Sequence, residues 1–108
     1  MNMANSNGPG LKMLLTYNIL PEGQENYMRF VLNEFIPTLH SIGLANQGVW
    51  HTAWGAYPIR LLVFVSENAG AMTRAVESDA FEQMEEKLKG LVSEYHRRIV
   101  TFDPGFQF

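Results

Sequence analysis

His51 and Asn18 are the side chains of this sequence that we consider first as catalytic candidates. An imidazole titrates near neutral pH, so a histidine placed in a cavity would act as a general base. Asn18 puts a polar amide near the end of a predicted strand, where packing alone would favour an apolar side chain. These two residues mark the region in which we expect a site.

Three further residues extend this region to a ligand-binding set. Trp54 would stack on a flat ligand, and Arg97 or Arg98 would hold an anionic group through bidentate contacts. Tyr17 precedes Asn18 on the same predicted strand. The predicted ligand-binding residues are therefore Tyr17, Asn18, His51, Trp54 and Arg98.

Each of these residues also has a purely structural explanation, which the sequence leaves open. A histidine is often hydrogen-bonded at an interface, an asparagine bonds readily to local backbone, and large aromatic side chains mostly fill cores. Arginines at the start of a strand are often solvated or paired with acids. On a regular strand His51 and Trp54 face opposite sides, whereas Trp50 and Trp54 share one side.

Metal ions, cofactors and nucleic acids are not expected as partners. The chain has no cysteine, and His40, His51 and His96 come from separate predicted elements, without an i, i+4 pair that could bind zinc. Lys12, Arg29 and Arg60 are the only basic residues before Arg74, whereas proteins that bind nucleic acid usually gather basic residues on one face.

The 108 residues, 46% of them hydrophobic, fit a single domain. The longest apolar run, residues 61–65, is far shorter than the roughly 20 residues that span a bilayer, so no membrane segment is expected. Residues 1–10 carry neither a positive charge nor an apolar stretch, and we expect a disordered lead-in rather than a secretory signal. We expect one domain over residues 11–108 and a cytoplasmic location.

The predicted elements are strands and helices in two similar halves. Residues 11–20 predict a strand, and apolar residues at steps of three and four predict a helix from Tyr27 or Met28 to Ile42. We expect Pro37 to kink or restart this helix and Gly43 to end it. Residues 47–56 and 60–65 predict two strands in an antiparallel hairpin.

The second half repeats the helix–strand order. Residues 72–77 predict a helical turn, and Ser78 or Asp79 offers an N-cap, with Glu82 placed to complete a capping box from Asp79. An amphipathic helix then carries apolar residues at helical spacing, and residues 96–102 predict the last strand. Those apolar residues are Phe81, Met84, Leu88, Leu91, Val92 and Tyr95.

The order strand, helix, strand, strand, helix, strand is that of the ferredoxin-like α+β fold. Such a fold places both helices on one face of a four-stranded antiparallel sheet. Both faces of the first and third predicted strands are apolar, although a solvated face should alternate with polar residues. We therefore expect a homodimer that closes sheet against sheet.

Three segments carry a family resemblance that covers nearly all of residues 11–102. They are FIPTLHSIGL at residues 35–44, RLLVFV followed by ENAGAM at residues 60–72, and SDAFEQMEEKLKGLVSEYHRRIV at residues 78–100. With them the chain resembles the dimeric α/β-barrel superfamily, which includes NIPSNAP-like, stress-responsive, EthD-like and antibiotic-biosynthesis monooxygenase-like domains.

The resemblance implies sheets paired into a barrel and, in enzymatic members, a cavity between sheet and helices. Haem-degrading relatives are similar in having an asparagine on the first strand and a tryptophan in the sheet, here Asn18 and Trp54. Their axial histidine comes from the second helical region, and residues 67–95 of this chain contain no histidine, which argues against haem chemistry.

Two hypotheses about function follow. The first is a dimeric barrel that binds a small, largely apolar molecule between sheet and helices, with cofactor-independent monooxygenase-like chemistry as one form of it. The second is a non-enzymatic interaction or structural homodimer without a small-molecule site. Because one fold hosts many activities, the resemblance alone does not choose between them.

Overall fold

A computed structural model of the chain describes residues 10–52 and 59–102, and all structural statements below concern these residues. The strands are β1 (Gly10–Ile19), β2 (Ala45–Thr52), β3 (Ile59–Ser66) and β4 (Val92–Phe102). Between β1 and β2 the chain forms a 3₁₀ turn, η2 (Pro21–Gly23), and the helical segments α1 (Gln24–Phe30), η3 (Val31–Phe35) and α2 (Ile36–Ser41). Between β3 and β4 it forms α3 (Ala69–Val76) and α4 (Asp79–Lys89).

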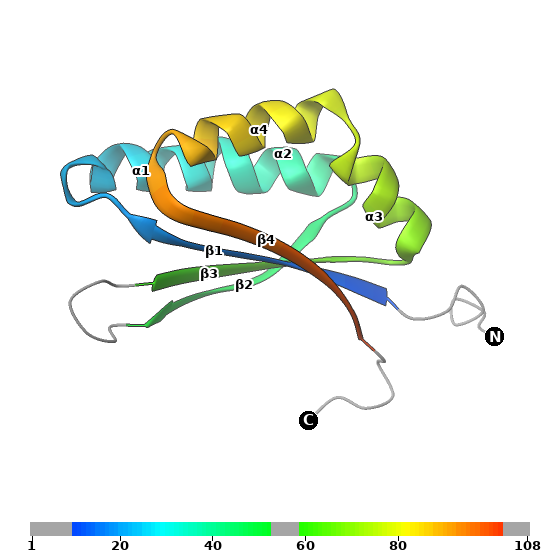
Figure 1. The fold of residues 1–108 in the computed structure, drawn as a ribbon. Helices are drawn as coiled ribbons and strands as arrows, with labels where there is room; N and C mark the ends of the chain where they lie inside the picture. The colour runs from blue at the N-terminus through cyan, green and yellow to red at the C-terminus, as the bar shows by residue number, and fades with distance from the viewer. Residues whose placement is uncertain (1–9, 53–58, 103–108) are drawn as a thin grey trace.

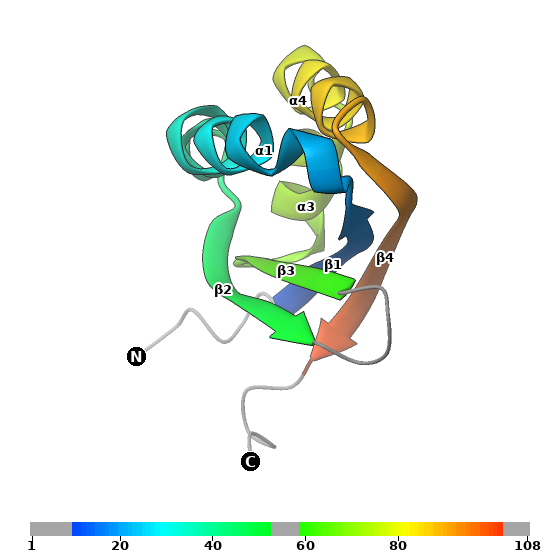
Figure 2. The same ribbon diagram turned by 90° about the vertical axis from the view of Figure 1, so that its left-hand side faces the viewer.

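The four strands form one antiparallel sheet in the order β2-β3-β1-β4, and the described helices lie together on one side of it (Figure 1). Seen along the strands, the helices form one layer and the sheet the other (Figure 2). This is the predicted ferredoxin-like α+β fold. The two central strands, β1 and β3, therefore have one face under the helices and one face that no described helix covers; we call the latter the open face.

The first helical run contains a π-helical turn at the position where Pro37 was expected to disturb it. In η3 the backbone N–H of Ile36 donates to the carbonyl of Val31, five residues earlier, and α2 then starts with Pro37 in its first turn. A proline lacks the amide hydrogen and clashes with the carbonyl four residues before it, and the wider π turn accommodates both defects. The predicted helix end at Gly43 is also confirmed, since this glycine has a positive φ of 100°.

The second helical region differs from the prediction in where its elements begin and end. α4 stops at Lys89, so Leu91, Val92 and Tyr95 do not continue the helix. Gly90 follows its last turn, and β4 begins at Val92 rather than at residue 96. The apolar spacing continued by coincidence, because a strand that buries one side also presents apolar residues at intervals.

The capping residues confirm one prediction and correct another. Of the two predicted N-caps, Ser78 is the N-cap of α4, because its hydroxyl accepts a hydrogen bond from the Phe81 N–H, and Asp79 is already the first residue of the helix. Asn68 caps α3 in the same way through the Ala71 N–H, which makes a complete helix of the segment where we expected one turn. Asparagine and serine are preferred N-caps because their short side chains satisfy free N–H groups of the first turn.

The core lies between the helices and the covered face of the sheet. β1 contributes Met13, Leu15 and Tyr17, and β3 contributes Leu62 and Phe64, all at most 1% exposed. The helical segments fill the space above them with Tyr27, Phe30, Phe35, Leu39, Met72, Phe81 and Leu88.

Two bulges determine which side chains of the edge strands β2 and β4 lie on the covered face and which lie on the open face. The β1–β4 register shifts between Thr16 and Asn18, which leaves Glu94 as the additional residue of β4, and the shift brings Val92 as well as Tyr95 onto the covered face. The β2–β3 register shifts between Asn46 and Gly48, which turns Trp50 onto the open face, opposite Leu61. A bulge reverses the side-chain alternation of everything beyond it.

Glu94 adopts a φ of 55°, a left-handed conformation that costs an L-residue about 1 kcal/mol. We expect Glu94→Gly to leave the free energy of unfolding unchanged or to raise it by up to about 1 kcal/mol, because glycine adopts this φ without strain. The measurement is urea unfolding followed by circular dichroism. The matched control is Gln83→Gly within α4, which should lower the free energy of unfolding by about 1 kcal/mol. A larger loss for Glu94→Gly than for Gln83→Gly would contradict the strain argument.

Candidate functional site

The structure divides the predicted ligand-binding residues between the two faces of the sheet. Tyr17 pairs with Arg60 across β1 and β3, and Arg60 pairs with His51 across β3 and β2. Directly opposite residues of antiparallel strands share a face, so these three form one row on the covered face, with His51 at its exposed end. Asn18 and Arg98 lie on the open face instead, and Trp54 lies outside the described residues.

Arg60, at the centre of this row, is a residue that the sequence analysis did not select. The sequence places Arg60 at the start of the predicted strand 60–65, where its neighbours are apolar. The sequence does contain a signal for this residue. Arg60 is two and four positions before Leu62 and Phe64, so on a regular strand its cationic side chain lies on the same, buried face.

Beside Arg60 lies a cluster of three tyrosines. The hydroxyl oxygens of Tyr17 and Tyr27 are 2.6 Å apart and hydrogen-bonded, and both residues are 1% exposed. The Tyr95 ring stacks on that of Tyr17, with 6.4 Å between the ring centroids. The cluster joins β1, α1 and β4 at the end of the sheet where β1 ends and β3 begins.

Glu85 of α4 closes the β4 side of the cluster. Its Oε2 accepts a hydrogen bond of 2.6 Å from the Tyr95 hydroxyl and forms an ion pair with Arg97, whose Nε lies 2.9 Å away. Arg97 also stacks over the Phe81 ring at 5.4 Å. Because Glu85 is 9% exposed, these charge-assisted contacts provide the polar partners that a buried carboxylate needs.

The three phenols are held in the protonated state. Burial raises the pKa of Tyr17, and the neighbouring Tyr27 raises it further. Burial raises the pKa of Tyr95, as does the hydrogen bond it donates to Glu85, and burial likewise raises the pKa of Tyr27. The site therefore presents hydroxyl hydrogens and not phenolate charges.

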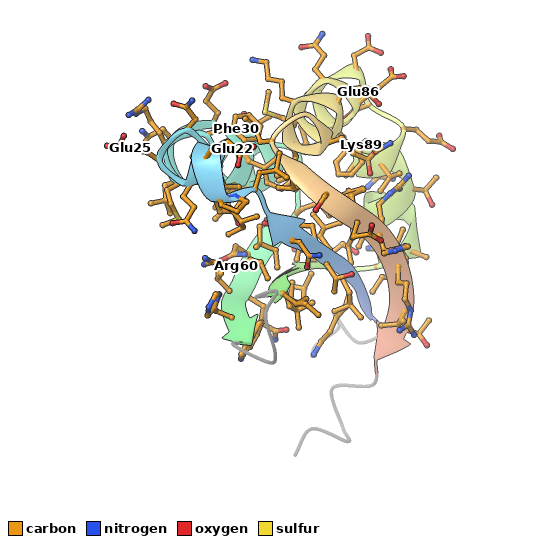
Figure 3. All side chains as sticks on the ribbon, turned by 60° about the vertical axis from the view of Figure 1, so that its left-hand side comes forward. Glu22, Glu25, Phe30, Arg60, Glu86 and Lys89 are labelled. Carbon is orange, nitrogen blue, oxygen red and sulfur yellow. The ribbon has the colours of Figure 1, made fainter. Side chains whose placement is uncertain are left out.

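Arg60 has an incomplete environment. Its guanidinium carbon lies 5.8 Å from the centroid of the Tyr27 ring, a cation–π contact. Its Nε is buried and has no hydrogen-bond partner. Figure 3 shows Arg60 at the side of the sheet below α1, and neither Glu22 nor Glu25 above it forms an ion pair with it within the described part of the chain.

A separate groove opens at the other end of β1, between α3 and the strands. Its volume is about 240 Å³. Four apolar side chains and two polar ones line it: Leu11, Met72, Val76 and Ile99, with Thr73 and Glu77. Small-molecule sites are predominantly apolar with a few polar groups, and this lining has that composition.

The open face is apolar at its centre. From β3 it presents Ile59, Leu61, Val63 and Val65, and the Trp50 ring of β2 lies over Gly48 beside them, so close that a Cβ on Gly48 would come within 2.6 Å of it. Trp50 is 48% exposed and Ile59 43%, whereas Leu61 and Val65 are half-buried and Val63 is 5% exposed. Lys12, Asn18, His96 and Arg98 bring polar groups to the β1–β4 side of this face.

The described residues were also considered for metal binding and for membrane-spanning helices. In the part of the chain that the structure describes, no cluster of three or more histidine, cysteine or acidic residues is arranged to hold a metal ion. No helix within residues 10–52 and 59–102 is long and apolar enough to cross a membrane.

Comparison with solved structures identifies the fold. A conserved protein from Methanosarcina mazei Go1 matches with a TM-score of 0.69 and 16% identity, covering 94% of this chain and 100% of that chain. A NIPSNAP family protein from Agrobacterium tumefaciens matches with a TM-score of 0.61 and 17% identity, covering 88% and 94%. SnoaB, a cofactor-independent oxygenase from Streptomyces nogalater, matches with a TM-score of 0.65 and 12% identity, covering 86% and 92%.

Fold and site together define a small α+β protein with a two-layer ferredoxin-like fold. More particularly, its fold is similar to that of NIPSNAP family proteins and of a cofactor-independent oxygenase, as the sequence resemblance predicted. No family model matches the sequence. A search of curated proteins finds no match either. At these identities the similarity establishes the fold and leaves the activity to be argued from the site.

The raised phenol pKa values predict how stability depends on alkaline pH. In the unfolded chain a tyrosine ionises near pH 10, whereas Tyr17, Tyr27 and Tyr95 remain protonated in the folded chain above that pH. The folded state then binds more protons than the unfolded state, so stability is complete below pH 10 and falls above it, by about 1.4 kcal/mol per pH unit for each such phenol.

The measurement is phenolate absorbance at 295 nm against pH, with circular dichroism recorded in parallel. We expect three of the four tyrosines to ionise only together with unfolding. Ionisation of three tyrosines near pH 10 in a chain that is still folded would show that the cluster is open to water.

Proposed function

We propose that this protein is a homodimer, paired through the open faces of its sheets, that binds a small and largely apolar molecule between sheet and helices. The observation that carries the proposal is the uneven cover of the sheet: the helices bury one face, and apolar side chains occupy the centre of the other. Assembly and ligand binding are thereby assigned to different faces of the molecule.

The argument for a second copy begins with the composition of the open face. An antiparallel sheet with one face in water normally alternates apolar and polar residues, but β3 places four apolar side chains in succession on its open face. Contiguous exposed apolar patches mark interaction surfaces. In a symmetric dimer both copies offer the same patch, so this one surface satisfies both partners. The pairing of sheets implied by the superfamily resemblance supports the same arrangement.

The groove beside α3 supports binding of a small molecule. Met72 and Val76 come from α3, and Leu11 and Ile99 from β1 and β4, so a ligand there would lie between helix and sheet. Thr73 and Glu77 would orient a polar substituent. A volume of about 240 Å³ suits a molecule of one or two rings.

Cofactor-independent oxygenase chemistry, the activity named for SnoaB, is a second candidate. The phenols of Tyr17 and Tyr27 favour it, because protonated hydroxyls beside an arginine can stabilise an oxyanion that develops on a substrate. Of the two catalytic candidates from the sequence, His51 lies on that face and Asn18 on the other. His51 is therefore the candidate base in such a site.

A charge at the centre of the open face should separate the dimer. We expect Leu61→Glu to raise the dimer dissociation constant at least about 100-fold, because each interface would bury two unpaired carboxylates. Sedimentation equilibrium measures this as a change from twice 12.3 kDa to 12.3 kDa.

Leu32→Glu is the matched control, because Leu32 is 57% exposed on the helical layer. It should leave the dimer intact. A wild-type monomer at micromolar concentration, or equal dissociation by both variants, would contradict pairing through the open face.

Closing the groove should abolish binding of an apolar ligand. Ile99 is 41% exposed at the groove, so Ile99→Trp adds volume into the groove with little cost to the core. With 2-naphthol as the probe, we expect the dissociation constant measured by fluorescence to rise at least about tenfold. Leu32→Trp, remote from the groove lining, should leave it unchanged.

Failure of wild-type protein to bind 2-naphthol, with no small molecule retained in native mass spectrometry, would favour the alternative of a structural homodimer without a ligand site. Equal weakening by Ile99→Trp and Leu32→Trp would place the binding elsewhere.

A further inference from the structure

We propose that Arg60, together with Tyr17, Tyr27 and His51, binds the carboxylate group of a small organic acid. This site is distinct from the apolar groove of the proposed function. Leu11 of the groove and Tyr17 are separated by six positions of β1, or about 20 Å along the strand. The two sites lie at opposite ends of the covered face.

The first argument is the unsatisfied state of Arg60. Its Nε is buried without a hydrogen-bond partner, and a buried donor that leaves water without a new partner costs about 1–3 kcal/mol. The cation–π contact with Tyr27 offsets part of the cost of the charge but leaves the buried Nε–H without an acceptor. A carboxylate supplies two acceptor oxygens in the geometry of the guanidinium fork.

Arg97 shows what a satisfied arginine looks like in the same protein. It lies on the same face and forms an ion pair with Glu85, with 2.9 Å between Nε and Oε2, while its guanidinium stacks on Phe81. Arg60 has the matching aromatic contact with Tyr27, yet no described acidic side chain forms an ion pair with it. The missing component at Arg60 is a carboxylate, which Arg97 obtains from the protein itself.

The neighbours of Arg60 are hydrogen-bond donors of a suitable kind. In the Tyr17–Tyr27 pair one hydroxyl donates to the other, so the accepting hydroxyl keeps its own hydrogen for a ligand. A phenol is protonated at neutral pH, and burial raises the pKa of both groups further. His51, exposed at the β2 end of the row, adds an imidazole N–H.

The same composition argues against other ligand classes. The row contains a fixed positive charge and no acid among its described members, which repels metal cations and gives a neutral ligand no compensating charge. Arg98 lacks these features, because it lies on the open face, away from the buried hydroxyls. Arg98→Gln is therefore the control variant.

The experiment compares benzoate with benzamide, a neutral molecule of nearly the same shape. We expect benzoate to bind the wild-type protein at least about tenfold more tightly than benzamide by isothermal titration calorimetry, and to shift the Nε–Hε resonance of Arg60 in the NMR spectrum. Arg60→Gln should weaken benzoate binding at least about tenfold, whereas Arg98→Gln and Ile99→Trp should leave it unchanged.

Equal affinity for the two molecules, or equal weakening by Arg60→Gln and Arg98→Gln, would overturn the proposal. Should Arg60→Gln fail to fold, the comparison of benzoate with benzamide and the Arg60 resonance, both measured on wild-type protein, still decide it. Loss of 2-naphthol binding in Ile99→Trp concerns the groove alone, so either site can fail without the other.

Discussion

The alternation of side chains along β1 and β3 is the constraint on which the rest of this structure depends. Both strands are central, and the helices cover only one of their faces. On the covered face Met13, Leu15, Leu62 and Phe64 build the core, and the same alternation continues to Tyr17 and Arg60 at the end of the sheet. A polar cluster thus grows directly out of the hydrophobic core. Because the two central strands are held rigidly in the sheet, the side chains of this cluster have well-defined positions.

The polar cluster is an expensive feature for a domain of this size. Glu85, Arg97 and Tyr95 offset their burial among themselves, through one hydrogen bond and one ion pair to the same carboxylate oxygen. Arg60 is not compensated in this way, and its buried Nε has no partner. A methionine or leucine would fill the position without that cost. Departures from good packing and pairing concentrate at functional sites, which is why Arg60 and not the better satisfied Arg97 indicates ligand binding.

The sequence predicted the fold because its signals were local and periodic. The order of elements, the disturbance at Pro37 and the helix end at Gly43 all followed from spacing or from the geometry of single residues. The boundary between α4 and β4 was missed because apolar residues beyond Lys89 continued at helical spacing. The predicted site residues remain a prediction. Tyr17 and His51 do share a face, but only the bulge in β2 and the pairing of β3 between β1 and β2 place Arg60 between them.

The bulges also explain how the two faces of one sheet come to carry different sets of side chains. If β2 kept a regular alternation from Asn46 onward, Trp50 would turn toward the helices and the apolar centre of the open face would lose its largest side chain. If β4 kept a regular alternation, Val92 and Tyr95, three positions apart, would lie on opposite faces. Each edge strand therefore changes its alternation once, and the central strands keep theirs throughout. In the proposed function, assembly and ligand recognition would therefore rest on different residues of the same strands, and a substitution on one face would have little effect on the other.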